Sequence, residues 1–472
     1  MSGVEANRAA GPARLRRAVL VPGAASVAFG VSLVASAADP VLGWTVLGAL
    51  ALCALIAVVA WRPAVGTYVY VSTVCLVAGI DRNTLIPLLR PNEALLSIVL
   101  VGASVGGWYR FLGGARSPMS FTRVDLALAG FLLFSTVWPV TSVLVRGAWP
   151  TSLDVASLLP VCKLVALYLL VRHTVLTEHQ CALLVRLMVR SGAVVALIAL
   201  LQTLHVGPVI GVLHRFYAPD ESAGEVGDRG GATLGSPLST GDVVVIALVL
   251  LLCCHRRALF GRKESLVLGI VLCAGVPAAG EFSTWIAAVV ALGLLLWRMP
   301  ELRRPALRAT PLVAVAAVVG APAFLRRVGE FSGSGVPESW LGRWDNLSNF
   351  FLPRFDLTHI VLGVAPNPVL NAPETWREVI YLESGYLYFL WIGGIPLLVA
   401  FIWLSVEVLR AVRRDRLVPG VGGGCASALE ILWWVLLVLT VLDPHLTVRG
   451  TGDLLFPLLA LVMGRSRDRQ PA

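Results

Sequence analysis

The sequence contains few charged residues. Only 14% of its 472 residues are charged and the mean hydropathy is +0.81, whereas a soluble domain carries about 25% charged residues. This scarcity excludes a soluble globular protein. Apolar runs of about 15 to 25 residues follow one another, and each is long enough to cross a hydrocarbon core of about 30 Å. The chain is therefore expected to be an integral membrane protein.

The sequence also lacks the motifs of several enzyme classes. It has no P-loop, no GxGxxG after a strand and no HExxH motif, which leaves ATP-driven pumping, nucleotide cofactors and zinc proteolysis without local support. The eight cysteines lie in apolar runs or at their inner edges, without CxxC or Cys/His spacing. They therefore indicate neither an external disulfide framework nor a zinc site. We expect no cofactor and no metal.

The apolar runs are continuous rather than alternating, which indicates helices rather than a β-barrel. We expect an all-α polytopic membrane protein, a single transmembrane domain over residues 1–472 with about 14 transmembrane helices. The expected helices are 18–38, 41–60, 65–80, 93–109, 124–144, 155–171, 187–206, 236–254, 265–279, 282–297, 309–325, 384–409, 427–442 and 451–464. Between helices 11 and 12 lies a large hydrophilic loop, 326–383, which is expected to be partly helical. The glycine-rich stretch Gly420 to Gly424 reads as a flexible loop between helices.

The basic residues predict the orientation of this chain. With the N-terminus inside, 26 of the 38 Lys and Arg residues fall on one face and 11 on the other, with Lys163 inside a helix. Short cytoplasmic loops retain Lys and Arg, so both termini are expected in the cytoplasm and the 326–383 loop outside. The net charge of +10 then reflects this bias and contact with membrane lipids, and no nucleic-acid partner is expected.

The first stretch with candidate chemistry is Asp228 to Gly241, which runs into the helix expected at 236–254. Pro237 suits the first turn of a helix, and the exposed amides at a helix N-terminus favour an anion. Arg229 adds a full positive charge beside them. The alternative is a glycine-rich turn with an arginine that reaches the membrane surface.

The second stretch is Pro337 to Phe351. Pro337 and the following Glu suit a helix start, and Trp340, Trp344 and two later apolar residues recur at helical spacing. Arg343 falls on a different face of this expected helix, where its guanidinium can bind phosphate through two parallel hydrogen bonds. An interfacial helix with tryptophan anchors and solvated charges is an equally good interpretation.

The third stretch is Tyr381 to Gly394, where the chain re-enters the membrane. Glu383 stands at this point, and partial desolvation raises the pKa of a carboxylate towards the range of a general base. The same carboxylate could instead bind a sugar hydroxyl, pair with an arginine, or simply begin a helix.

Taken together, these stretches resemble the superfamily of O-antigen ligases and Wzy-type O-antigen polymerases, over about residues 185 to 410. The resemblance rests on the order of short motifs: Arg229 with Gly235-Ser236-Pro237, Ser283 in Gly280-Glu281-Phe282-Ser283-Thr284, Arg343-Trp344 in the large loop, Gly363, Glu383-Ser384, Tyr386 and Gly393-Gly394. Two positions depart from the family pattern. Family members often have Ser-Arg at Ser283-Thr284, and ligases commonly have His-Asn at Glu383-Ser384, so the choice between polymerase and ligase stays open.

The resemblance implies a membrane glycosyltransferase of the bacterial plasma (inner) membrane. Its donor would be a polyprenyl-pyrophosphate-linked glycan and its acceptor a glycan or a lipid-linked glycan. Arg229 and Arg343 would stabilise the pyrophosphate leaving group without a metal, and Glu383 would be the base of an inverting transfer. Substrate contacts are expected from Arg215, Arg354, Tyr386, His445 and Arg449.

A transporter or flippase of a lipid-linked saccharide or polar solute is the main alternative. Many helices with Pro and Gly interruptions also suit alternating access. Transporters place ionisable residues near the middle of the membrane, and Lys163 is the strong candidate of that kind in this sequence.

Overall fold

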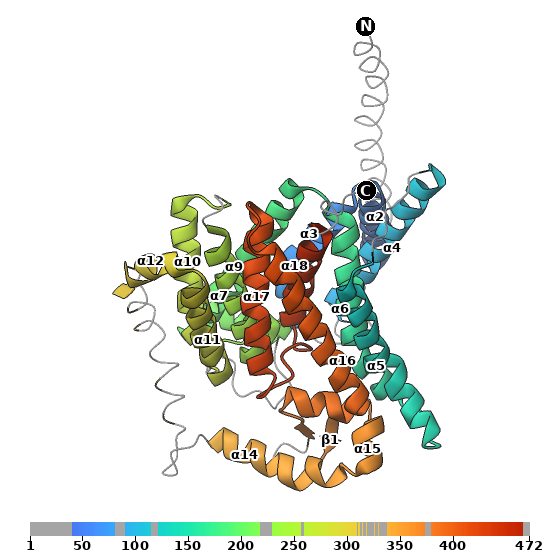
Figure 1. Ribbon diagram of the computed structural model, residues 1–472. Coiled ribbons are helices and arrows are strands. Elements are labelled where there is room, and N and C mark those ends of the chain that lie inside the picture. The colour runs from blue at the N-terminus through green and yellow to red at the C-terminus, as the bar shows by residue number, and fades with distance from the viewer. Residues whose placement is uncertain are drawn as a thin grey trace. The chain divides into compact units, whose positions relative to one another are not determined.

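The computed structural model describes residues 40–80, 90–114, 121–217, 229–255, 259–308, 338–372 and 379–465, with isolated positions between 310 and 329 (Figure 1). The described residues are mostly helical. By contacts, the chain divides into two compact units, Met1–Gly66 with Ile98–Ala115 and Thr67–Ser97 with Arg116–Ala472.

Unit 1 is held together by two glycines. It contains α2 (Pro40–Trp61), the beginning of α3 (Pro63–Val77) and the later part of α4 (Pro91–Leu112). Gly102 and Gly106 lie one turn apart on α4. A Cβ atom at Gly102 would lie 2.9 Å from Val59 Cβ, and one at Gly106 only 2.1 Å from the carbonyl oxygen of Ala60. Small residues at this spacing let two membrane helices approach closely, so α2 and α4 pack backbone against backbone.

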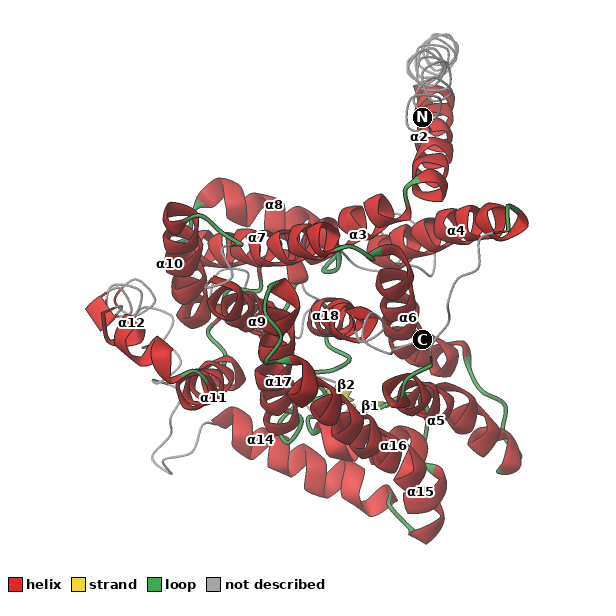
Figure 2. Ribbon diagram, turned by 45° about the horizontal axis from the view of Figure 1, so that its top comes forward, coloured by secondary structure: helices red, strands yellow, loops and turns green. Residues whose placement is uncertain are grey.

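Unit 2 is a helical bundle built around one apolar helix. Its longer elements are the end of α3, the start of α4, α5 (Arg123–Val145), α6 (Ser152–Thr174), α7 (Glu178–Thr203), α8 (Gly207–Tyr217), α9 (Pro237–His255), α10 (Arg262–Ala279), α11 (Phe282–Arg298), α12 (Arg303–Arg308), α16 (Gly385–Asp415), α17 (Val421–Leu439) and α18 (Thr451–Arg465), and short 3₁₀ turns lie at η2 (Ala232–Leu234) and η3 (Pro300–Leu302). The central helix is α9, which contacts α7, α10, α11, α17 and α18 (Figure 2). A helix that is apolar on all sides is buried, and 78% of the apolar window of α9 is buried.

Seven of the described helices are long and apolar enough to cross a membrane: α4, α5, α6, α7, α9, α16 and α17. Shorter apolar helices occur at Thr45–Trp61, Pro63–Val77, Phe282–Arg298 and Thr451–Gly464. The chain is thus an α-helical membrane protein, as its composition predicted. Of the expected helices, 18–38 lies outside the described residues and 309–325 is described only at isolated positions. The count of 14 therefore stays a prediction.

The glycine-rich stretch at 420–424 is not the flexible loop that its composition suggested. Gly420, with φ of 86°, precedes the first turn of α17, and the residues after it are helical and buried. The reason is packing, because a Cβ atom at Gly424 would lie 3.0 Å from Cys254 Sγ and 3.2 Å from the Cys253 carbonyl oxygen of α9. Glycine here allows α17 to lie against α9. At its other end α17 stops at Leu439, three residues before the expected end.

The segment between the bundle helices α11 and α16 contains short elements. They are α14 (Glu338–Asn346), a π-helical turn η4 (Leu347–Phe351), a 3₁₀ turn η5 (Leu352–Arg354), α15 (Leu357–Leu362) and an antiparallel pair of strands, β1 (Val369–Asn371) and β2 (Val379–Tyr381). Leu370 pairs with Ile380 in this hairpin. The loop is therefore partly helical, as expected, but the two strands were not predicted.

Close backbone contacts attach this segment to the bundle. A Cβ atom at Gly363 would lie 2.5 Å from the Ile392 carbonyl oxygen, and one at Gly394 only 2.2 Å from that of Val361. Both glycines have positive φ, and Gly394 interrupts the helical geometry of α16. The Val364 N–H donates to the Trp391 carbonyl over 2.6 Å. In Figure 1, α14, α15 and β1 lie at the end of unit 2 where α16 begins.

Candidate functional site

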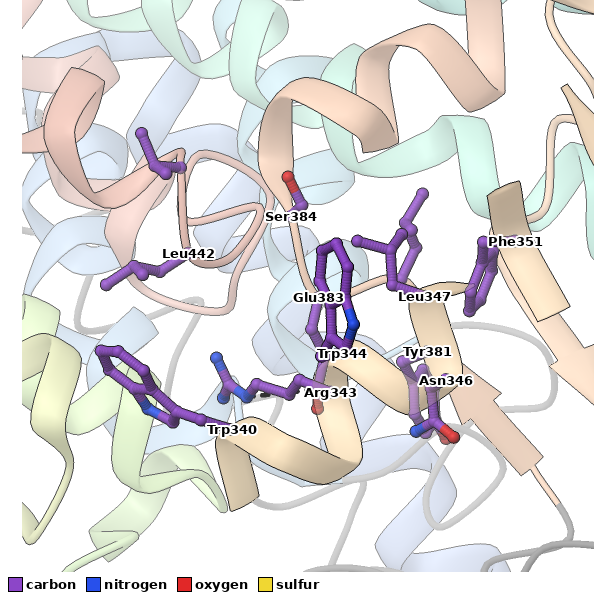
Figure 3. Close-up of a pocket in the computed structure, with 12 residues that line it drawn as sticks. Trp340, Arg343, Trp344, Asn346, Leu347, Phe351, Tyr381, Glu383, Ser384 and Leu442 are labelled. Carbon is purple, nitrogen blue, oxygen red and sulfur yellow. Dashed lines mark ion pairs between the residues drawn. The ribbon is translucent and has the colours of Figure 1, made fainter. Parts of the chain in front are cut away.

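Arg343 on α14 binds two carboxylates that belong to other elements. Its Nε atom lies 3.0 Å from Oε2 of Glu383 (Figure 3). Its Nη1 donates to Oδ2 of Asp443 over 3.0 Å. The side chains of Arg343 and Glu383 are about a quarter exposed, at 27% and 23%, whereas that of Asp443 is 7% exposed. One guanidinium therefore joins α14 to two points of the bundle by charge-assisted hydrogen bonds.

The backbone brings the two carboxylates together at the start of α16. The strand β2 leads directly to Glu383, and α16 begins at Gly385. The Gly385 N–H donates to the Thr440 carbonyl over 2.8 Å. A Cβ atom at Gly385 would lie 2.9 Å from the carbonyl oxygen of Asp443. Because Gly385 has no side chain, the loop after α17 lies against the start of α16, and Asp443 comes beside Glu383.

A cavity of about 220 Å³ opens next to the Arg343 ion pairs. Its lining includes Trp340, Trp344, Asn346, Leu347, Phe351, Tyr381, Ser384, Val441 and Leu442 in addition to Arg343 and Glu383. Figure 3 shows that α14 supplies one wall and the strand leading into α16 another. An apolar wall with a few charged groups is typical of a binding site.

The apolar stripe predicted in Pro337 to Phe351 contacts the bundle at two places. Phe351 is buried with its ring 5.1 Å from that of Trp391, and the ring of Trp340 lies 6.5 Å from that of Phe282. Trp344 is 65% exposed. The stripe thus rests on the bundle at its two ends, and the residues between them face the cavity.

Neighbouring charges shift the acid–base properties of this site. Burial by itself lowers the pKa of Arg343, but Asp443 and then Glu383 outweigh it and raise that pKa above its usual value. Burial raises the pKa of Asp443 despite the opposing charge of Arg343. Glu281 contributes to both shifts, so a third carboxylate acts on the same pair.

Arg229 joins this group through Glu281. Its Nη1 atom lies 3.6 Å from Oε2 of Glu281, whose side chain is 11% exposed. The Gly230 N–H donates to the Ala278 carbonyl, which holds the Arg229 segment against the end of α10. Arg229 is not among the described residues that line the cavity. The structure therefore brings Arg343 and Glu383 together directly, whereas Arg229 pairs with Glu281, whose charge acts on Arg343 and Asp443.

His445 lies deeper, two residues beyond Asp443. Its side chain is fully buried, with Nδ1 2.8 Å from Oδ2 of Asp242 on α9. The Thr451 hydroxyl donates to the same oxygen over 2.6 Å. The Nε2 atom of His445 has no hydrogen-bond partner among the described residues. His445 is therefore part of a buried network below the cavity and does not line the cavity itself.

We predict that this network makes the folded protein less stable at alkaline pH. Burial lowers the pKa of His445, but Asp242, by charge and hydrogen bond, and Asp443 outweigh burial and the opposing charge of Arg343, so that pKa lies above its ordinary value of 6.5. A folded-state pKa above the unfolded one stabilises the protein below the unfolded value, and that stabilisation is lost as pH rises through the folded value. The melting temperature of the detergent-purified protein should fall as pH increases above about 6.5. His445→Gln should flatten this pH profile, and an equal slope in the variant would contradict the assignment.

The other predicted contact residues are spread over unit 2. Arg449 lies beside the turn before α9, because its Nη1 donates to the Gly79 carbonyl over 3.4 Å and lies 3.6 Å from where a Cβ atom of Gly235 would be. Arg215 is exposed on α8 with its guanidinium 5.4 Å from the Phe216 ring centre. Arg354 is exposed in η5.

Tyr386 has a packing role in this structure. Its hydroxyl donates to the Leu437 carbonyl over 2.9 Å, and its ring lies 6.2 Å from that of Phe401. The hydrogen bond to Leu437 fixes the first turn of α16 against α17. The residue therefore supports the position of Glu383.

Several acidic residues near the site were not predicted as functional candidates from the sequence. Asp443 lies in a short loop between two apolar runs, and Asp242 lies inside an apolar run. An ionisable residue within a membrane helix is a functional candidate by default, and that signal could have identified Asp242. It also applies to the pair formed by Lys163 and Asp453, whose Nζ and Oδ2 atoms lie 2.9 Å apart. No local signal indicated that Asp443 would meet Arg343.

Within the described parts of the chain, no group of three or more His, Cys, Asp or Glu side chains is placed to hold a metal ion. Comparisons with family models, with curated proteins and with solved structures find no match for the chain.

Proposed function

We propose that this chain is a membrane glycosyltransferase that uses a polyprenyl-pyrophosphate-linked glycan. The observation that carries the proposal is Arg343, held between Glu383 and Asp443 at the edge of an open cavity. A pyrophosphate donor needs a positively charged group at the leaving group and a base at the acceptor. The cavity has one of each, Arg343 and Glu383, and their Nε and Oε2 atoms lie 3.0 Å apart.

The arginines supply the positive charge. A guanidinium has five N–H donors, and the two ion pairs of Arg343 engage Nε and Nη1. The remaining donors can bind pyrophosphate oxygens as the bond to the sugar breaks, which stabilises the developing charge. Arg229 provides a second guanidinium beside Glu281, and no metal ion is needed for this step.

Glu383 accepts the proton. The acceptor hydroxyl attacks the anomeric carbon from the face opposite to the pyrophosphate, and its proton passes to the Glu383 carboxylate. The bond between the anomeric carbon and the pyrophosphate oxygen breaks, and its electron pair leaves with polyprenyl pyrophosphate. This single displacement inverts the anomeric carbon. The acceptor is a glycan or a lipid-linked glycan, so the product is a polymerised or ligated surface polysaccharide.

The proposed location is the bacterial inner membrane with the cavity on its outer face. Both termini then lie in the cytoplasm, as the excess of basic residues on that side indicates. Polyprenyl-linked glycans reach their polymerising enzymes on the outer face, which agrees with a cavity at the end of unit 2 that carries α14 and α15.

The decisive experiment uses the full chain in nanodiscs. Lipid-linked glycan would be extracted from a strain that lacks the chain, where its own donor should accumulate. We expect release of polyprenyl pyrophosphate together with a longer or transferred glycan. A nanodisc has no enclosed compartment, so a transporter yields no product there. Absence of product, with donor movement across sealed liposomes that contain the chain, would contradict the proposal.

A transporter or flippase is the second candidate, and one observation favours it. Lys163 and Asp453 form an ion pair between α6 and α18, and the Tyr70 hydroxyl donates to the other oxygen of Asp453 over 2.8 Å. Buried ionisable groups in membrane helices mark proton or ion pathways in many transporters. The liposome experiment decides between the two candidates.

A further inference from the structure

Three arginines converge on one buried carboxylate in the middle of α17, away from the cavity. Glu430 on α17 is 3% exposed, and its oxygens lie 3.0 Å from Nη2 of Arg298, 3.1 Å from Nη1 of Arg416 and 3.9 Å from Nε of Arg413. Arg298 ends α11, and the other two arginines lie at the end of α16. We call these four residues the inner arginine cluster.

The inner arginine cluster has more positive charge than it neutralises. Three positive charges face one negative charge, which leaves a net charge of +2. Two carboxylate oxygens cannot satisfy the donors of three guanidinium groups, because each group has five N–H donors. The Nε atom of Arg298 is buried and has no hydrogen-bond partner among the described residues. The cluster therefore has both the charge and the donors to bind an anion.

The inner arginine cluster is also accessible. The side chains of Arg298, Arg413 and Arg416 are 25%, 55% and 33% exposed. Trp297 is 63% exposed, and the guanidinium of Arg298 lies 4.4 Å from the centre of its ring. Tryptophan is enriched at the level of lipid headgroups.

The inner arginine cluster lies at a distance from the cavity, as the length of α11 shows. Helix α11 begins beside Glu281, near the candidate site, and ends at Arg298. Sixteen residues at 1.5 Å per residue place the two ends about 24 Å apart. That distance approaches the thickness of the hydrocarbon core, so the arginines at the ends of α11 and α16 lie towards the membrane boundary opposite the cavity.

We propose that the inner arginine cluster binds the phosphate of an anionic phospholipid headgroup. The phosphate takes the donors that Glu430 leaves and neutralises the excess charge. Basic pockets between membrane helices at the cytoplasmic boundary bind anionic headgroups in this way. The proposal does not depend on the glycosyl-transfer activity, because the cluster shares no residue with the cavity.

The test measures lipid binding to the purified full chain by native mass spectrometry, with phosphatidylglycerol compared with phosphatidylcholine. We expect the wild type to retain phosphatidylglycerol preferentially. Arg298→Gln and Arg416→Gln, made singly so that Glu430 keeps one close partner, should each weaken this binding by about fivefold. Glu430→Gln removes the competing negative charge and should strengthen it.

Arg190→Gln is the matched control. Arg190 forms a one-to-one ion pair with Glu264 at 2.7 Å and is 51% exposed, so its loss removes an exposed arginine without an excess charge. Equal loss of phosphatidylglycerol in this control, or no preference over phosphatidylcholine in the wild type, would overturn the proposal. Unchanged binding in both cluster variants, or displacement of the lipid by millimolar inorganic phosphate, would overturn it as well. Melting temperatures of all variants show whether each is folded, and if Glu430→Gln does not fold, the two arginine variants still decide.

Discussion

Replacing Glu383 by Gln is expected to lower turnover by about 10² to 10⁴ while the donor still binds. Gln keeps the shape of the side chain but cannot accept the proton of the acceptor hydroxyl. The ion pair with Arg343 is lost, yet Arg343 keeps its hydrogen bond to Asp443 at 3.0 Å. Donor binding and product formation, measured separately in nanodiscs, distinguish a lost base from a lost binding site.

Two further variants sharpen this experiment. Asp345→Asn removes an exposed acid of α14 that accepts a hydrogen bond from Asn349, and it should leave turnover unchanged. Asp443→Asn removes the other partner of Arg343 and should disturb donor binding more than Glu383→Gln does. Full activity in Glu383→Gln would remove Glu383 as the base.

Replacing Arg343 by Lys is expected to reduce donor use by about 10² to 10³, the usual loss when one transition-state donor is removed. Lysine keeps the charge, but its ammonium group cannot reproduce the planar fork that contacts Glu383 and Asp443 at the same time. The defect should therefore appear in donor binding as well as in turnover, unlike that of Glu383→Gln.

Arg190→Lys provides the control for this variant. Arg190 is 51% exposed and pairs with Glu264 rather than with a residue of the cavity, so its change tests whether the loss of any guanidinium has the same effect, and it should leave donor use unchanged. Equal activity in Arg343→Lys and the wild type would show that charge alone suffices and would remove the bidentate role from the mechanism.

The fold was largely predictable because membrane helices follow from local composition. An apolar run such as 236–254 has few alternatives in a bilayer, and α9 begins at Pro237 within one residue of the expected start. The ends were less predictable where packing overrides composition. Gly420 to Gly424 illustrates this, since five residues that favour a loop in isolation lie in or beside a helix, and Gly424 packs closely against α9.

The candidate site was predictable only in part. Arg343 and Glu383 could be identified because charges are conspicuous at the edges of apolar runs, and the structure places them 3.0 Å apart. Their partner Asp443 could not, because it reaches them through the contact between Gly385 and the loop after α17. Tyr386 and His445 were expected to contact substrate from the family resemblance, whereas their hydrogen bonds are made within the protein.

The close packing of Gly363 against Ile392 and of Gly394 against Val361 has a consequence for how mutations in this protein would present. Neither residue carries a reactive group, yet a single added methyl at either position would meet a carbonyl oxygen at 2.5 Å or less. The displaced segment is the one that carries Arg343 and the hairpin leading to Glu383. An inactive allele could therefore retain every charged residue of the cavity, and a genetic screen that sorted variants by the chemistry of the altered side chain would overlook it.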